Sequence, residues 1–218
     1  MKKTICMILS ALMLCGCAQN STDTAPGASV TPTAVPTASP TAVPTASAEP
    51  KETITNPVDV ETSVPDMSGY TFLKDNDPSF LKISFQDALR MFAEGGTGIL
   101  YYGSSGCPWC QRAVPVLDEA AEEQGIQVYY VDTGVYDFTQ EEFDQLMKYT
   151  EVLLVTDSEG EKSFQIPQVI ALKDGEIIGY HLALVDGFSI EDESSDLNEE
   201  QSEQLLAIYR QLILSVTD

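Results

Sequence analysis

Apolar positions in the part of the chain after residue 70 follow two spacings. Short continuous apolar runs are typical of strands that are buried on both faces, whereas apolar residues that recur every three or four positions mark one face of a helix. The two spacings alternate along this part of the sequence. We therefore expect strands at 80–83, 99–102, 126–131, 168–172 and 176–180.

Polar residues and glycines mark where the intervening helices begin and end. Ser84 precedes an apolar helical face and Gly95 follows it, which predicts an N-cap and a stop. Thr139 and Glu142 have the spacing of a capping box. Further helices are expected at 107–124 and at the end of the chain, where the apolar face consists of Leu205, Leu206, Tyr209, Leu212 and Ile213.

The last two expected strands are joined by Lys173, Asp174 and Gly175, and Asp-Gly between two apolar runs is a hairpin signal. Strands and helices otherwise alternate along the chain. This order predicts an α/β fold in which helices cover both faces of a sheet that ends in a hairpin.

Residues 18–66 show neither spacing and are rich in Thr, Ala, Ser and Pro. An eight-residue unit occurs twice between residues 33 and 48, as TAVPTASP and TAVPTASA. Such a segment buries too little apolar surface to offset the entropy lost on ordering. We expect a disordered linker over 17–69, either a spacer or low-complexity sequence without a role, and a folded domain over 70–218.

The first residues have the pattern of a signal peptide over 1–16. Lys2 and Lys3 precede an apolar stretch that is shorter than the roughly 20 residues needed to span a bilayer. The stretch ends in LCGC, which resembles the lipobox of secreted bacterial lipoproteins and implies cleavage before Cys17 and lipid on it. The alternative is an ordinary secretory signal. The lipid would anchor the protein at the outer face of the bacterial cytoplasmic membrane.

Charge excludes several classes of function. The 218-residue chain has 34 acidic against 11 basic residues and a net charge of −23. Such a surface repels phosphates, so nucleic-acid binding and charge-driven binding to anionic lipids are excluded. The single histidine, His181, gives no basis for a histidine network and is interpreted as a packed or surface residue.

Such processing would remove Cys6 and Cys15 and place lipid on Cys17, so only Cys107 and Cys110 would remain as thiols. They flank Pro108 and Trp109, follow the strand at 99–102 through a small Gly/Ser loop, and open a helix. Unpaired N–H groups and the helix dipole stabilise a thiolate at an N-cap. A proline at the next position costs no hydrogen bond, because an N–H there would have no partner within the helix. A thiolate there attacks a disulfide, and the second cysteine resolves the mixed disulfide.

Two other interpretations of the cysteine pair stay open. A structural zinc site needs four ligands, and the processed chain offers two cysteines and one histidine, so we expect no metal. A purely structural disulfide would close so short a loop that it would constrain the unfolded chain little. We expect no cofactor apart from a redox-active Cys107–Cys110 disulfide.

The stretch CPWCQRAVPVLDEAA resembles the active-site helix of the thioredoxin superfamily, with Pro115 where that family has its helix-kinking proline. Ile166 and Pro167, just before an expected strand, resemble the family's cis-proline loop. The resemblance implies a thioredoxin-like fold over 70–218, with a central mixed sheet flanked by helices.

By the same resemblance, Cys107 would be the nucleophile and Cys110 the resolving thiol. Pro167 would be cis, the Ile166 backbone would pair with an extended substrate, and the Trp109 ring would lie beside the disulfide and shape substrate contact. The likeness is strongest to exported or lipid-anchored bacterial thioredoxin-like proteins, some of them bacteriocin transport accessory proteins.

The sequence departs from the family at Tyr101, where thioredoxins have a buried Asp that helps to move the proton of the resolving cysteine. No replacement base is evident, so we expect proton transfer through water. Gly106 replaces the family's Trp before the first cysteine, and the span to Pro167 is longer than in a minimal thioredoxin.

Two functions follow from these expectations. The first is a membrane-tethered, monomeric thiol–disulfide oxidoreductase that acts on cysteines of exported proteins or peptides, together with an unidentified membrane redox partner. The second is an accessory module that binds an exported peptide or a transporter while its cysteines stay idle. Trapping of partners through Cys107 in a Cys110→Ser variant would distinguish them.

Overall fold

The computed structural model describes residues 54–75 and 77–217. The predicted signal peptide over 1–16, the lipidation site Cys17 and most of the predicted linker lie outside these residues. Among the described residues, no helix combines the length and apolarity needed to cross a bilayer.

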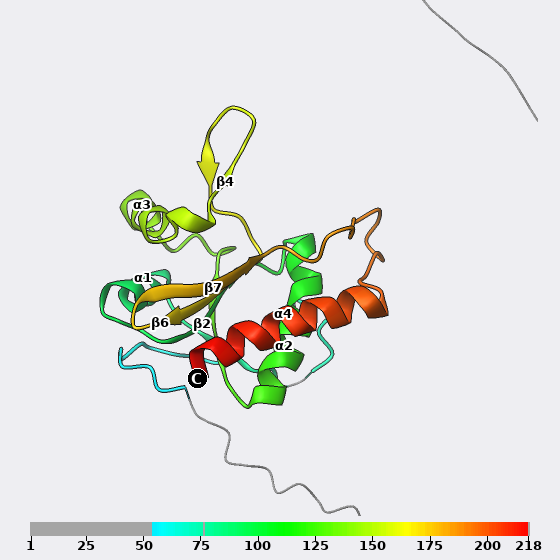
Figure 1. Ribbon diagram of the computed structural model, residues 1–218, viewed down its shortest axis with the longest axis horizontal. Coiled ribbons are helices and arrows are strands. Elements are labelled where there is room, and N and C mark those ends of the chain that lie inside the picture. Colours follow the sequence, from blue (N-terminus) through cyan, green and yellow to red (C-terminus); the bar gives the residue numbers. More distant parts are fainter. Residues whose placement is uncertain (1–53, 76, 218) are drawn as a thin grey trace, which may run out of the picture. The chain divides into compact units, whose positions relative to one another are not determined.

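The centre of the fold is a five-stranded mixed sheet with the order β1-β3-β2-β6-β7 (Figure 1). β1, β2 and β3 are mutually parallel, β6 runs antiparallel to β2, and β7 runs antiparallel to β6. The bounds are Phe80–Lys82 for β1, Gly98–Gly103 for β2, Val128–Asp132 for β3, Gln168–Lys173 for β6 and Glu176–Leu182 for β7.

Helices cover both faces of this sheet, and each face has its own hydrophobic cluster. One cluster packs beneath α2 and α4 and includes Tyr101, and the other packs beneath α1 and α3 and includes Tyr102. Consecutive residues of β2 therefore point to opposite faces, as strand geometry requires. The helices are α1 Phe85–Ala93, α2 Pro108–Gln124, α3 Gln140–Tyr149 and α4 Glu199–Thr217.

The strand order and the two helical layers confirm the predicted α/β class, a thioredoxin-like fold with a central mixed sheet flanked by helices. The predicted caps also form. The Ser84 side chain accepts a hydrogen bond from the Asp87 N–H, and Thr139 and Glu142 make a complete capping box. Gly125, in the left-handed conformation (φ 65°), ends α2.

The additional length expected before Pro167 includes elements between α3 and β6 that were not predicted. A short 3₁₀ helix, η1 Glu151–Leu153, leads to a hairpin of β4 Val155–Thr156 and β5 Lys162–Ser163, which projects away from the main sheet (Figure 1). Its strands are two residues long and mostly exposed, so they carry none of the apolar pattern that marks a buried strand.

The packed part of the chain begins before residue 70. Val58 and Met67, within the range predicted as linker, are buried, and Ser63 forms a β-bridge with Lys82. These isolated apolar residues find partners on the domain only through tertiary contact, which composition does not show. We interpret 54–69 as an arm that lies on the domain.

Candidate thiol site at the start of helix α2

The two cysteines lie where β2 gives way to α2. Cys107 is the N-cap of α2 in extended conformation (φ −89°, ψ 118°), and Pro108 occupies the first helical turn. The loop between strand and helix is held by its own polar groups. The Cys107 N–H donates to the Ser104 carbonyl at 3.0 Å, and the Gly106 N–H donates to the Ser104 hydroxyl at 3.2 Å.

Gln111 fixes the same loop from inside α2. This buried amide donates to the carbonyls of Ser105 and Gly69, and its carbonyl oxygen accepts from the Thr71 N–H at 2.8 Å. Its role was not predicted, because a glutamine one position after a cysteine carries no signal until the chain folds.

The environments of the two sulfurs differ sharply. Both cysteines are free thiols, but Cys107 is half-buried while Cys110 is fully buried. The Cys110 N–H donates to Cys107 Sγ at 3.2 Å, as expected for an N-cap side chain. One sulfur can therefore reach a partner, and the other can reach only the first.

This arrangement separates the acidities of the two thiols. Hydrogen bonding from the Cys110 thiol lowers the pKa of Cys107 to about 7, with further help from the Cys110 and Trp109 N–H groups and against the opposing effect of burial. Burial, followed by the Cys107 sulfur, raises the pKa of Cys110 far above its usual range. Near neutral pH, a single thiolate forms, at the accessible position.

Pro167 and Ile166 lie at the same end of the sheet as the cysteine loop. Tyr102 of β2 pairs with Gln168 of β6, so the preceding Pro167 lies beside Gly103, where the chain leaves toward Cys107. The Ile166–Pro167 peptide bond is cis, in agreement with the resemblance. Pro167 is buried, and Ile166 is half-buried against both hydrophobic clusters.

Trp109 contacts the loop that precedes α4. Its half-buried ring meets the Phe188 ring edge-to-face, with centroids 5.7 Å apart. The indole therefore packs against Phe188 rather than extending fully into solvent.

Arg112 anchors the same loop, and sequence reasoning missed it. Its guanidinium group is almost fully buried and donates to the carbonyls of Pro108, Glu193 and Ser195 at 2.7–2.9 Å. It also lies 4.2 Å from the centroid of the Phe72 ring. The loop that precedes α4 is therefore bound to α2 through its main-chain carbonyls, which the sequence does not reveal as acceptors.

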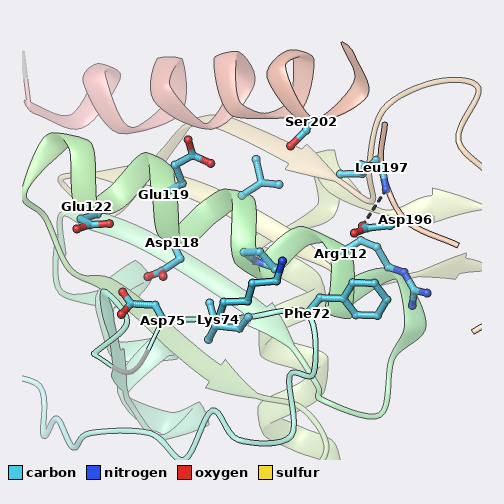
Figure 2. Close-up of a pocket in the computed structure, with 13 residues that line it drawn as sticks. Phe72, Lys74, Asp75, Arg112, Asp118, Glu119, Glu122, Asp196, Leu197 and Ser202 are labelled. Atoms are coloured by element: carbon cyan, nitrogen blue, oxygen red, sulfur yellow. Dashed lines mark hydrogen bonds between the residues drawn. The ribbon is translucent and has the colours of Figure 1, made fainter. Parts of the chain in front are cut away.

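A cavity of about 400 Å³ lies farther along α2, and its lining residues come from this helix, the 72–75 segment and the start of α4 (Figure 2). Asp75, Asp118 and Glu122 lie toward one end of it, and Arg112 lies near Phe72 at the other. Asp118 accepts a hydrogen bond from the Ser79 N–H at 2.7 Å, while burial raises its pKa. Neither cysteine lines this cavity, so it is separate from the thiol site.

His181 is a packed residue. Its Nε2 lies 3.1 Å from the Leu184 carbonyl, its ring meets Tyr209 edge-to-face, and burial lowers its pKa. Within residues 54–75 and 77–217, no group of three or more His, Cys, Asp and Glu side chains is placed to hold a metal ion.

Comparison with known proteins gives one kind of match. No protein-family model matches the chain. No curated protein matches it either. Among solved structures, the thioredoxin from Aeropyrum pernix matches with 18% identity and a TM-score of 0.31, over 44% of this chain and 70% of that one. Because both values are low, the fold is assigned from the strand order and pairing.

Proposed function

We propose that the protein is a thiol–disulfide oxidoreductase whose reacting groups are Cys107 and Cys110. The observation that supports this best is the asymmetry of the pair. One sulfur is accessible, with a pKa lowered to about 7, and the other is fully buried behind it. A structural disulfide needs no such difference, whereas exchange needs one attacking thiolate and one thiol held in reserve.

The exchange proceeds in two steps. The Cys107 thiolate attacks one sulfur of a substrate disulfide, and the other substrate sulfur leaves as a thiolate. Cys110 then attacks Cys107, which releases the second substrate sulfur and leaves a Cys107–Cys110 disulfide. The substrate gains two electrons and the cysteine pair loses two. The reverse sequence oxidises a substrate dithiol, and the reduction potentials of the two partners set the direction.

The substrate is an extended segment of a protein or peptide that lies between Trp109 and Ile166. Among the described residues, no hydrogen bond engages the Ile166 main chain, so its N–H and C=O groups are open to strand-like pairing. The Trp109 ring, held by Phe188, supplies an apolar contact on the other side of Cys107.

The same proposal includes the place of action. The pattern of residues 1–17 supports export and lipid anchoring through Cys17 at the outer face of the bacterial cytoplasmic membrane, with the domain as a monomer on its linker. Disulfides persist in that compartment, so exported proteins or peptides are the proposed substrates, with a membrane protein as redox partner and no cofactor beyond the cysteine pair.

Equilibration of the full chain with glutathione buffers of graded potential tests the proposal. We expect the pair to pass reversibly between dithiol and disulfide, and a Cys110→Ser variant to retain a mixed disulfide on Cys107 after reaction with a model disulfide peptide. The matched Cys107→Ser variant should retain none. If the pair does not cycle and Cys110→Ser traps nothing, while a variant without both cysteines still binds a peptide, the protein is a binding module instead.

A further inference from the structure

A buried hydroxyl beside the thiol site has no partner. The Tyr101 side chain is completely buried, and its hydroxyl has no hydrogen-bond partner of good geometry within the described residues, although the side chains of Cys110 and Tyr70 lie close enough to act on its pKa. Its oxygen fills the space that a Cβ atom at Gly103 would need, directly before the cysteine loop. An unpartnered buried hydroxyl costs free energy, so its retention in place of an apolar side chain calls for an explanation.

Two other tyrosines of the same cluster lie beside Tyr101. Tyr101 on β2 is the register partner of Tyr130 on β3, and their rings stack with centroids 5.5 Å apart. The Tyr70 hydroxyl donates to the Tyr130 hydroxyl at 3.1 Å. Two residues after Tyr130, on the same face of β3, is Asp132, whose partly exposed carboxylate pairs with Lys82 at 3.5 Å.

Cys110 lies at the inner end of this series. Cys110, Tyr101, Tyr70 and Tyr130 belong to one buried cluster beneath α2 and α4. Burial is the main cause of the high pKa of Tyr101, and the nearby Cys110 and Tyr70 raise it further. Asp132 acts on the pKa of Tyr130 in the same way. The groups that act on these pKa values therefore form a series from Cys110 through the tyrosines to Asp132.

We propose that the Tyr101 hydroxyl takes the proton of Cys110 when the mixed disulfide is resolved, and that Tyr70 and Tyr130 pass this proton on to Asp132. This inference rests on the proposed oxidoreductase function. It replaces the water route expected from the sequence with a path built from the protein's own hydroxyls.

The proton moves as Cys110 forms its bond to Cys107. The S–H proton passes to the Tyr101 oxygen while the Tyr101 proton passes to Tyr70, the Tyr70 proton to Tyr130, and the Tyr130 proton to Asp132. Asp132 then releases a proton to water, and the departing substrate thiolate is protonated by solvent. No charge is left inside the core.

Neutral tyrosines suit this role better than a single buried base. Each hydroxyl can donate one hydrogen bond and accept others, so a proton enters at one oxygen while a different proton leaves. The bond from the Tyr70 hydroxyl to the Tyr130 hydroxyl already has the direction that the proposed path needs. A carboxylate beside Cys110 would itself need to be desolvated, whereas here the only charge lies at the partly exposed end.

The neighbouring tyrosine supplies a matched control. Tyr102 is also fully buried on β2, and its hydroxyl likewise has no partner within the described residues. It faces α1 and α3, on the other side of the sheet from Cys110. Replacing either tyrosine by Phe removes one unpartnered hydroxyl from the core, but only Tyr101→Phe interrupts the proposed path.

The test follows the two steps separately with dithiobis(nitrobenzoate), a chromophoric disulfide, and the full chain. Attack by Cys107 releases a first nitrothiophenolate, and resolution by Cys110 releases a second. We expect Tyr101→Phe to slow the second release at least about tenfold near neutral pH and to leave the first unchanged. Tyr102→Phe should change neither, and the wild type should resolve more slowly in D₂O.

If Tyr101→Phe releases the second nitrothiophenolate at the wild-type rate, or if Tyr102→Phe slows that release equally, the relay is wrong and the proposed function still stands. Absence of the first release from the wild type would instead refute the proposed function. Should Tyr101→Phe fail to fold, Tyr70→Phe and Tyr130→Phe are the next variants. Slower resolution in both supports the relay, and the wild-type rate in both contradicts it.

Discussion

The two faces of the central sheet use similar residues for different purposes. Beneath α1 and α3, the cluster around Tyr102 holds apolar and aromatic side chains and no cysteine. Beneath α2 and α4, the cluster around Tyr101 also contains Cys110 and three further tyrosines, of which Tyr70 and Tyr130 share a hydrogen bond. Adjacent residues of β2 thus lie in two different clusters, only one of which contains Cys110, so burial alone does not indicate a role.

The largest expected effect is loss of disulfide exchange on the α2 face while the protein stays folded. Cys107→Ser removes the only accessible sulfur of the pair, so reduction of a model disulfide should fall to background. The substitution is nearly isosteric and its site is half-buried, so chemical denaturation should give an unfolding free energy close to that of the wild type. A large drop in stability would mean that the pair is structural.

The α1 face should show the opposite behaviour. Leu100 of β2 is fully buried in the cluster on this face, and Leu100→Ala should lower the free energy of unfolding by about 2–5 kcal/mol because it removes apolar contacts and leaves a cavity. At a temperature where the variant is folded, its rate of attack on dithiobis(nitrobenzoate) should match the wild type. A slowed attack would show that the two faces are coupled.

The third prediction concerns Arg112, which binds the loop before α4 to α2. Arg112→Ala leaves two loop carbonyls and the Pro108 carbonyl without their donor, so we expect a loss of about 1–3 kcal/mol in unfolding free energy and faster proteolysis around residues 189–196. Arg210→Ala, which removes an exposed pair with Glu123, is the control and should leave both measurements near wild type. Equal effects would contradict a specific anchor.

The smallest expected effect is at the exposed cap of α3. Thr139→Ala removes the hydroxyl that accepts the Glu142 N–H, and should lower the unfolding free energy by about 1 kcal/mol. Disulfide exchange should not change, because α3 packs on the face opposite the cysteines. Thermal unfolding and the exchange rate, measured on the same sample, check both statements.

Features with local causes could be predicted from the sequence. The caps at Ser84 and Thr139 and the N-cap position of Cys107 depend on residues within a few positions of each other, and all three form. The strands of the main sheet were found by their apolar runs, with ends shifted by one or two residues.

Features with distant causes could not be predicted. The Arg112 carbonyl partners lie more than 80 residues away at Glu193 and Ser195, and nothing in their sequence marks them as acceptors. The stacking of Tyr101 on Tyr130 depends on strand register, which apolar runs leave undefined. Residue 101 could be recognised as unusual from the sequence, but its neighbours could not be identified.

The central claim is that Cys107 is the accessible thiolate and Cys110 the buried thiol in reserve, and the pH dependence of alkylation tests it most directly. Iodoacetamide should modify Cys107 with a rate that rises through pH about 7 and levels off above it, while Cys110 stays unmodified in the folded dithiol. An ordinary thiol would titrate near about 8.5. Equal modification of both cysteines with that ordinary profile would contradict the account.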